Sequence, residues 1–369
     1  MIIGVPKEIK DQEFRVAVTP AGTDQLVKAG HQVLVQKNAG KGSSMSDQEY
    51  RDAGATIVNS AKQVFERAEM VVKVKEPQPS EIKMLRSGQI LFTYLHLAPE
   101  PELTRALMKQ NVAAIGYETV QLEDGSLPLL TPMSEVAGRM SVYEGAKYLE
   151  STRGGKGLLI SGVPGVRNAT VTIIGGGVAG MNAATVALGL GAHVNVLDIS
   201  LPRLRYLEEV LHGINTVYYT PMALEALLRQ TDLLVGTVLV RGARAPKIVS
   251  RKMLRTMEKG SVVVDVSIDQ GGCIATSKPT THTDPTFIVD GIVHYCVANM
   301  PGAVAHTSTV ALTNATLPYV LKLANQGFYD AIQNDASLAN GVNTHKGKLT
   351  DAAVAEALKL PFTPLADTL

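Results

Sequence analysis

The chain has 369 residues, of which 45% are hydrophobic and 19% charged, and its formal net charge is +1. This length suits two domains with packed cores, and the composition excludes an intrinsically disordered chain. A net charge close to zero predicts no surface for nucleic acid or another polyanion. The two cysteines, Cys273 and Cys296, are too few for a disulfide scaffold.

The N-terminal stretch MIIGVPKEIKDQEF has no apolar core behind a basic start, so we predict no signal peptide. Residues 169–197 contain no Asp, Glu, Lys or Arg, and this stretch is long enough to span a membrane. The stretch is rich in glycine and changes midway from β-branched residues to alanine, which favours a strand, a turn and a helix instead. We therefore expect a soluble cytoplasmic protein without a membrane segment.

Residues 1–128 alternate between short apolar runs and helical patterns, which predicts a mostly parallel sheet. The runs that are typical of strands are MIIGV, HQVLV, MVVKV, QILFTY and VAAIGY. A helical stretch then begins at Thr131-Pro132 and continues to about Leu149, with threonine suited to the N-cap and proline to the first turn. We interpret this helix as a connector between domains.

Residues 170–300 form a second alternating series. Its six predicted strands are VTIIG, HVNVLD, INTVYY, DLLVGT, SVVVDVS and IVHYCV. Six strands with helical crossovers are typical of the doubly wound fold that binds dinucleotides.

A second long helix is predicted from about Thr307 to Gly327, where glycine suits the helix end, and Pro318 is expected to kink it. Residues 351–360 carry one more amphipathic pattern. The predicted fold class is α/β, with two doubly wound domains, one of them a Rossmann domain, joined by long helices. We expect a substrate domain of residues 1–130 plus about 307–369, and a nucleotide-binding domain of residues 131–306.

The sequence Gly175-Gly176-Gly177-Val178-Ala179-Gly180 has the spacing G-x-G-x-x-G, directly after a predicted strand and at the start of a helix. The first glycine allows a tight turn, the second a close approach to pyrophosphate, and the third close packing of helix and strand. The helix N-terminus adds N–H groups for the negative charge. A glycine-rich turn of no special purpose would show the same spacing.

The next predicted strand ends at Asp198, 21 residues after Gly177 (198 − 177). An acidic residue at this place accepts hydrogen bonds from a ribose hydroxyl, and its charge disfavours the 2′-phosphate of NADP. Arg203 and Arg205 follow closely and could pair with a phosphate, or could form a solvated helix face. This context predicts NAD as the cofactor.

Four polar residues are candidates for the substrate site, and three of them, Lys75, His96 and Asp269, lie at the ends of apolar strands. Arg15 is able to clamp a carboxylate, Lys75 follows MVVKV, and His96 ends ILFTYLHL with a side chain suited to acid/base work. Asp269 lies in a polar turn after SVVVDVSI, whereas Asp265 inside that strand is interpreted as structural. For each of them an ordinary surface or structural role is the alternative. No cluster of His and Cys indicates a metal site.

Seven segments together resemble the family of alanine dehydrogenases and NAD(P) transhydrogenase α-subunits. They are VPKEIKDQEFRVAVTPAG, VVKVKEPQPSE, LFTYLHLA, LLTPMSEVAGRMS, IIGGGVAG, VSIDQGGC and NMPGAVAHTST. The resemblance covers essentially the whole chain. It implies NAD-dependent oxidative deamination of L-alanine to pyruvate and ammonium, and a homohexamer.

The resemblance also implies roles for individual residues. Arg15 and Lys75 would bind the substrate carboxylate, with Tyr94 and Met133 shaping a small pocket. His96 would be the general acid/base, and Asp269 would hold and activate water or ammonia. The NAD site would be lined by Ser134, the glycine loop with Val178 and Ala179, Asp198, Arg203, Thr220, Val238, Leu239, Val240, Ile268, Asp269, Asn299 and Met300. Serine is common in the family at the position of Thr220, and the hydroxyl is retained.

Three other functions remain open on the sequence. A subunit of a proton-translocating transhydrogenase would bind NAD(H) without turning over amino acids, and would need membrane partners. An NAD-binding sensor would also lack turnover. A related amino-acid dehydrogenase would act on a larger substrate.

Overall fold

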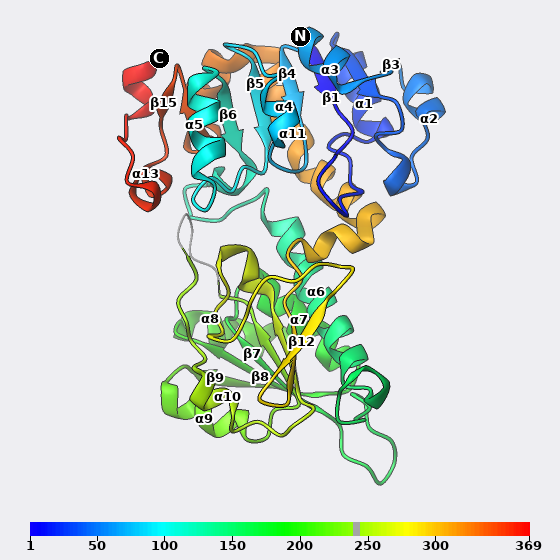
Figure 1. Cartoon of the computed structure of the whole chain (residues 1–369), viewed down its shortest axis with the longest axis vertical. Coiled ribbons are helices and arrows are strands. Elements are labelled where there is room, and N and C mark those ends of the chain that lie inside the picture. The colour runs from blue at the N-terminus through cyan, green and yellow to red at the C-terminus, as the bar shows by residue number, and fades with distance from the viewer. Residues whose placement is uncertain (239–243) are drawn as a thin grey trace. The chain divides into compact units, whose positions relative to one another are not determined.

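The computed structural model describes residues 1–238 and 244–369, which form two compact units. Unit 1 comprises Met1–Met133 together with Gly302–Leu369, and unit 2 comprises residues 134–238 and 244–301. Each unit contains one sheet in which parallel strands predominate (Figure 1). The predicted class, two doubly wound α/β domains, is confirmed.

The sheet of unit 1 has the strand order β15-β14-β6-β5-β4-β1-β2-β3. Its parallel part is β1 (Ile2–Val5), β2 (Gln32–Gln36), β3 (Thr56–Val58), β4 (Met70–Val72), β5 (Ile90–Thr93) and β6 (Ala113–Gly116). The C-terminal strands β14 (Val342–His345) and β15 (Lys348–Leu349) extend it in antiparallel fashion beside β6. Both ends of the chain therefore build one sheet.

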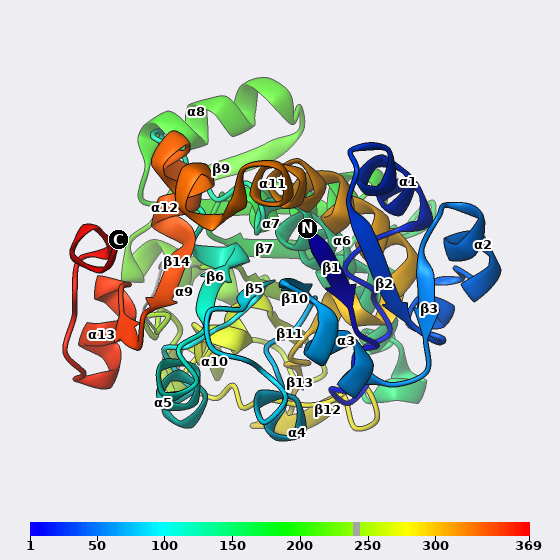
Figure 2. The same cartoon turned by 90° about the horizontal axis from the view of Figure 1, so that it is seen from above.

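Helices cover both faces of this sheet. Figure 2 shows α1 and α11 on one side and α3, α4 and α5 on the other. The α-helices of unit 1 are α1 (Pro20–Lys28), α2 (Asp47–Asp52), α3 (Ala61–Arg67), α4 (Pro79–Ile82), α5 (Pro101–Lys109), α11 (Ala305–Asn334), α12 (Ala336–Gly341) and α13 (Ala352–Leu358). Short 3-10 helices are η1 (Lys41–Ser43), η2 (Tyr117–Thr119) and η6 (Leu365–Thr368), together with η5 (Met300–Val304), which begins in unit 2.

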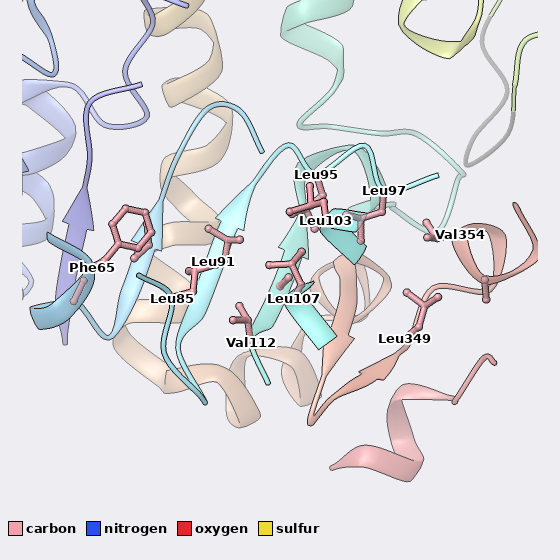
Figure 3. Close-up of a cluster of buried hydrophobic side chains, with 14 residues drawn as sticks. Phe65, Leu85, Leu91, Leu95, Leu97, Leu103, Leu107, Val112, Leu349 and Val354 are labelled. Atoms are coloured by element: carbon pink, nitrogen blue, oxygen red, sulfur yellow. The ribbon is translucent and has the colours of Figure 1, made fainter. Parts of the chain in front are cut away.

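A buried apolar cluster joins residues 65–114 to the C-terminal segment on one face of the unit 1 sheet. Phe65 of α3, Leu91 of β5 and Leu107 of α5 lie in it together with Leu349 and Val354 of the C-terminal segment (Figure 3). All five are buried, so the tail is an integral part of the core of unit 1.

The second long helix is broken at Gly327, where the sequence predicted its end, and a further helical segment follows. Helix α11 extends to Asn334, and Gly327 interrupts it with non-helical angles (φ 76°, ψ 174°). Glycine adopts this positive φ without a steric penalty, so the chain bends there and then resumes a helical path. Pro318 lies inside the same helix.

The sheet of unit 2 has the order β12-β13-β11-β10-β7-β8-β9. The strands are β7 (Thr170–Ile174), β8 (His193–Asp198), β9 (Ile214–Tyr218), β10 (Leu233–Gly236), β11 (Val262–Asp265), β12 (Thr286–Val289) and β13 (Ile292–Tyr295). All are parallel except the edge strand β12, which pairs with β13 in antiparallel fashion and was not predicted. The order reverses between β7 and β10, as in dinucleotide-binding sheets.

The helices of unit 2 are α7 (Val178–Gly189), α8 (Leu201–Val210), α9 (Pro221–Leu228) and α10 (Arg251–Leu254), with 3-10 helices η3 (Ser151–Arg153) and η4 (Val266–Gln270). Helix α6 (Thr131–Tyr148) starts at the end of unit 1 and continues in unit 2. The charge-free residues 169–197 fold into β7, α7 and β8, and no helix of the described ranges is both long and apolar enough to cross a bilayer.

Candidate active site

Three candidate substrate residues of unit 1 lie beyond the carboxyl ends of neighbouring strands in the middle of the sheet. Arg15 lies in the segment after β1, Lys75 follows β4, and His96 follows β5. Ligands of doubly wound sheets bind beyond the carboxyl ends of the strands, beside the point where the strand order reverses. In unit 1 that point lies between β1 and β4.

Arg15 is held by a buried, two-pronged ion pair with Glu13. Its Nε donates to Glu13 Oε1 (2.7 Å), its Nη2 donates to Oε2 (2.5 Å), and both side chains are at most 2% exposed. Burial by itself raises the pKa of Glu13, but the Arg15 guanidinium outweighs it and lowers this pKa to about 2. The remaining Nη1 donates to Met133 Sδ (3.0 Å), so Arg15 and Met133 are brought together.

Lys75 and His96 share an acidic neighbour, Glu76. Glu76 accepts a hydrogen bond from Lys10 (2.5 Å) through Oε1, while its Oε2 is buried without a hydrogen-bond partner. Burial raises the pKa of Glu76, yet the positive charges of Lys10 and Lys75, with a smaller contribution from His96, lower it overall. Lys75 itself is buried. A cation and an imidazole therefore lie within electrostatic reach of one carboxylate.

A second cluster of buried charged residues fixes the backbone between the end of β4 and Lys75. Lys73 Nζ donates to Glu8 Oε2 and to Glu81 Oε1, each at 2.9 Å, and the N–H of Val74 donates to Glu8 Oε1 (2.7 Å). Our sequence reasoning missed Glu8, Lys73 and Glu81. The available signal was a lysine inside the otherwise apolar run MVVKV, since a fully buried lysine requires acidic partners.

His96 is half-buried, and its ring stacks on that of Tyr94 with 5.6 Å between centroids and 6° between planes. The Tyr94 hydroxyl donates to the carbonyl of Leu129 (2.6 Å), close in sequence to Met133. Arg15 lies near enough to Tyr94 to influence its electrostatics. The structure therefore gathers Arg15, Lys75, Tyr94, His96 and Met133 in one region of unit 1.

The glycine loop of unit 2 connects β7 to α7. Gly175 has φ 97°, and a Cβ added at Gly180 would lie 1.8 Å from the Gly175 carbonyl oxygen, so no larger residue fits there. A Cβ at Gly177 would meet open space, and no side chain caps α7, whose first residue is Val178. This leaves the helix N-terminus suited to phosphate.

Asp198 and Arg203 both attach to this loop. Asp198 Oδ2 accepts from the N–H of Gly176 (2.7 Å) and Oδ1 from that of Ser200 (2.8 Å). Arg203 Nε donates to the Gly176 carbonyl (2.5 Å). The acidic end of β8 therefore lies beside the glycine turn, which is the arrangement that a dinucleotide site requires.

The other predicted nucleotide residues occupy strand ends and turns of unit 2. Ser134 lies one turn before Gly138 on α6, and a Cβ at Gly138 would lie 2.1 Å from the carbonyl oxygen of Ala179 in the first turn of α7. Thr220 caps α9 by accepting from the N–H of Ala223 (3.1 Å).

Val238 packs on the apolar core beyond β10, Ile268 and Met300 are buried, and Asn299 has φ 67°. The carbonyl of Asn299 lies 3.2 Å from His282 Nε2. The predicted residues Leu239 and Val240 lie outside the described residues.

Asp269 is exposed in η4. Hydrogen bonds from the loop to Asp265 and from Lys247 to the loop fix the segment that carries it. Asp265 Oδ1 accepts from the N–H of Ser267 (3.1 Å) and of Cys273 (3.3 Å), and its Oδ2 accepts from that of Ile274 (3.2 Å). Lys247 Nζ donates to the carbonyls of residues 271, 272 and 274 at 2.6, 2.9 and 3.3 Å. The buried Asp265 is thus a structural residue, and sequence reasoning missed Lys247. Among the described residues, no group of His, Cys, Asp and Glu is arranged to hold a metal ion.

Comparisons with known proteins match the entire chain. The N-terminal domain of the alanine dehydrogenase/PNT family matches residues 4–137, and its C-terminal domain matches residues 141–352. Proteins named alanine dehydrogenase from Methanococcus maripaludis and Halomonas elongata are each 55% identical to this chain, with 100% of both chains covered.

Solved structures agree with these matches. A structure named L-alanine dehydrogenase is 52% identical, has a TM-score of 0.93, and covers 97% of this chain and 99% of its own. A transhydrogenase from Sinorhizobium meliloti shares the fold with a TM-score of 0.81 at 23% identity, over 96% of this chain and 100% of its own. With both family domains matched and relatives similar along its full length, this chain belongs to the alanine dehydrogenase/PNT family.

Proposed function

We propose that this chain catalyses the reversible, NAD-dependent oxidative deamination of L-alanine to pyruvate and ammonium. The observation that carries the proposal is the 55% identity over the full length to proteins named alanine dehydrogenase. The gathering of Arg15, Lys75 and His96 beyond the carboxyl ends of neighbouring strands supports it. Residues 1–130 plus about 307–369 would form the substrate domain, and residues 131–306 the nucleotide domain.

The substrate carboxylate would be bound by Arg15 and Lys75. Glu13 holds the Arg15 guanidinium in a fixed plane, which pre-organises it for a planar carboxylate. Tyr94 and Met133 would flank the bound carboxylate and would suit a methyl side chain better than a long one. A larger substrate would require these two buried side chains to move.

Proton transfer would belong to His96, because an imidazole changes charge near neutral pH. It would accept a proton from the water that adds to the imine of pyruvate, return it to the nitrogen of the tetrahedral carbinolamine, and accept the hydroxyl proton as the C–N bond breaks and ammonia leaves. Asp269 would orient the water or ammonia. Fixed orientation of the reacting groups supplies a large part of the rate in such reactions.

NAD, when bound, supplies the hydride acceptor for the Cα hydrogen of alanine. The glycine loop and the open end of α7 fit its pyrophosphate, and Asp198 fits a ribose hydroxyl and disfavours NADP. The residues we assign to this cofactor are Ser134, Gly175, Gly177, Val178, Ala179, Gly180, Asp198, Arg203, Thr220, Val238, Leu239, Val240, Ile268, Asp269, Asn299 and Met300. We further propose that the protein is cytoplasmic and that it forms a homohexamer. Light scattering after gel filtration would test the hexamer.

The first experiment follows NADH absorbance with pyruvate plus ammonium, and NAD reduction with L-alanine, beside NADPH and other keto acids. We expect turnover with NADH, and a loss of about 10²- to 10⁴-fold in kcat for His96→Ala and Asp269→Ala. His212→Ala and Asp284→Ala replace exposed residues of the same types and serve as controls. Tight NADH binding without turnover would overturn the proposal and favour a transhydrogenase-like or sensing role.

A further inference from the structure

The backbone of His96 adopts a conformation that needs support. Its φ is 48°, in the left-handed region that residues other than glycine seldom occupy. Such conformations persist where the surrounding structure holds them, and they concentrate at functional sites. The stacking on Tyr94 holds only the ring of His96. Its backbone conformation therefore needs other contacts to stabilise it.

Glu118 supplies this support through its carboxylate. Oε1 accepts hydrogen bonds from the N–H of His96 (2.6 Å) and of Leu95 (3.1 Å), and Oε2 accepts from that of Leu95 (3.2 Å). Two successive N–H groups thus point at one negative charge. Hydrogen bonds to an ionised acceptor are stronger than neutral ones.

The sheet brings the two residues together. Strands β5 and β6 run parallel, with Thr93 paired to Gly116, so the chain leaves both strands at the same edge. His96 lies three residues beyond Thr93, and Glu118 lies two residues beyond Gly116 in η2. The Glu118 carboxylate therefore reaches the backbone that follows the neighbouring strand β5. Among the described residues, its hydrogen bonds go to this backbone and not to the imidazole of His96.

We propose that Glu118 is a positioning residue that sets the orientation of His96 for proton transfer. This inference rests on the proposed function, since it concerns the same acid/base group. Glu118 accepts a hydrogen bond from the backbone of His96, and Tyr94 stacks on the His96 ring. The two contacts together define the direction of the imidazole. Arg15 is oriented by Glu13 instead, which separates carboxylate binding from the orientation of His96.

The test compares Glu118→Gln and Glu118→Asp with the wild-type chain. A carboxamide removes the negative charge and replaces Oε2, an acceptor for the N–H of Leu95, by an NH2 group that cannot accept, so the hydrogen bonds to Leu95 and His96 are weakened. We expect kcat to fall about 10- to 100-fold while KM for pyruvate changes less than about threefold. Glu118→Asp keeps the charge and should recover part of kcat. Glu123→Gln, an exposed glutamate nearby in sequence, is the control.

A double-variant cycle separates positioning from a general structural role. If Glu118 acts through His96, Glu118→Gln lowers kcat in the wild-type background and has no further effect in the His96→Ala background. An unchanged kcat in Glu118→Gln, or an equal loss in both backgrounds, overturns the proposal. Loss of folding in both Glu118 variants, judged by thermal unfolding and NADH binding, also overturns it. A wild-type chain without turnover would instead refute the proposed function.

Discussion

At the scale of single residues, the cations of unit 1 owe their positions to buried carboxylates. Glu13 pairs with Arg15, Glu8 and Glu81 pair with Lys73, and Glu76 lies beside Lys75. Arg15 and Lys75 stood out as residue types suited to a carboxylate, and the family resemblance proposed them as substrate ligands. Their acidic partners were not predictable, because a contact between Lys73 and Glu8, 65 residues apart, depends on the register of the folded sheet.

Replacing Glu13 by Gln tests the Arg15 pair. The guanidinium would stay buried without its countercharge, so we expect the free energy of unfolding to fall by about 3 kcal/mol. The KM for pyruvate should rise about tenfold, equivalent to about 1.4 kcal/mol. Urea unfolding and steady-state kinetics measure the two effects, with the exposed Glu102→Gln as control. An unchanged KM would argue against Arg15 as a carboxylate ligand.

The same pair predicts how stability depends on pH. The folded-state pKa of Glu13, about 2, lies below its ordinary value of 4.5. Its pairing therefore stabilises the fold fully above 4.5, and this contribution is lost as the pH falls through 2. Because protonated Glu resembles Gln, the stability difference between wild type and Glu13→Gln should shrink over that interval. Urea midpoints at a series of pH values measure it; a constant difference would contradict the assignment.

At the scale of elements, the loops that follow the strands of unit 2 carry the proposed nucleotide site. The glycine spacing and Asp198 were sufficient to predict the loop between β7 and α7, since both are local signals. The loop with Asp269 was placed by sequence, but its attachment to Asp265 and Lys247 was not. Lys247 lies on a different segment, and no local pattern indicates that its ammonium group binds three carbonyls.

The glycine loop offers a matched pair of substitutions in α7. In Gly180→Ala the new Cβ would meet backbone at 1.8 Å, whereas in Gly189→Ala it would meet open space. We expect the first to abolish NADH binding, and the second to be neutral or to stabilise by up to about 1 kcal/mol through helix propensity. NADH fluorescence titration and thermal unfolding distinguish them. Equal NADH affinity in both variants would rule out tight packing at this turn.

Lys247→Met tests the attachment of the Asp269 loop. Without the ammonium group three carbonyls lose their donor, so the loop should loosen and kcat should fall about tenfold. Lys252→Met, which replaces an exposed lysine of α10, should have no effect on kcat. Initial rates at saturating substrates measure both. Identical rates in the two variants would show that Asp265 holds the loop by itself.

At the scale of the molecule, unit 1 is assembled from both ends of the chain. Strand β14 pairs with β6, and Leu349 and Val354 enter the cluster around Leu91 and Leu107. The sequence pattern indicated a final helix at 351–360 but could not show that the tail returns to the first sheet. That pairing joins Val342 to Ile115, and it has no local signal.

Leu349→Ala tests the contribution of the tail. The side chain is fully buried, so its loss should destabilise the fold by about 2–5 kcal/mol. Leu122→Ala, at a leucine that is 40% exposed in the same unit, should cost far less. Urea unfolding followed by circular dichroism measures both. A small effect of Leu349→Ala would show that the tail docks without supporting the core.

The sequence by itself determined the features that local patterns encode. Alternating apolar strands and helices specified two doubly wound sheets, and glycine spacing specified the nucleotide loop. The tertiary structure decided the rest: the edge strand β12, the return of the tail to β6, and the contact of Glu118 with Leu95 and His96. These depend on which strands become neighbours, and side chains that are distant in sequence find their partners only once the sheets have formed.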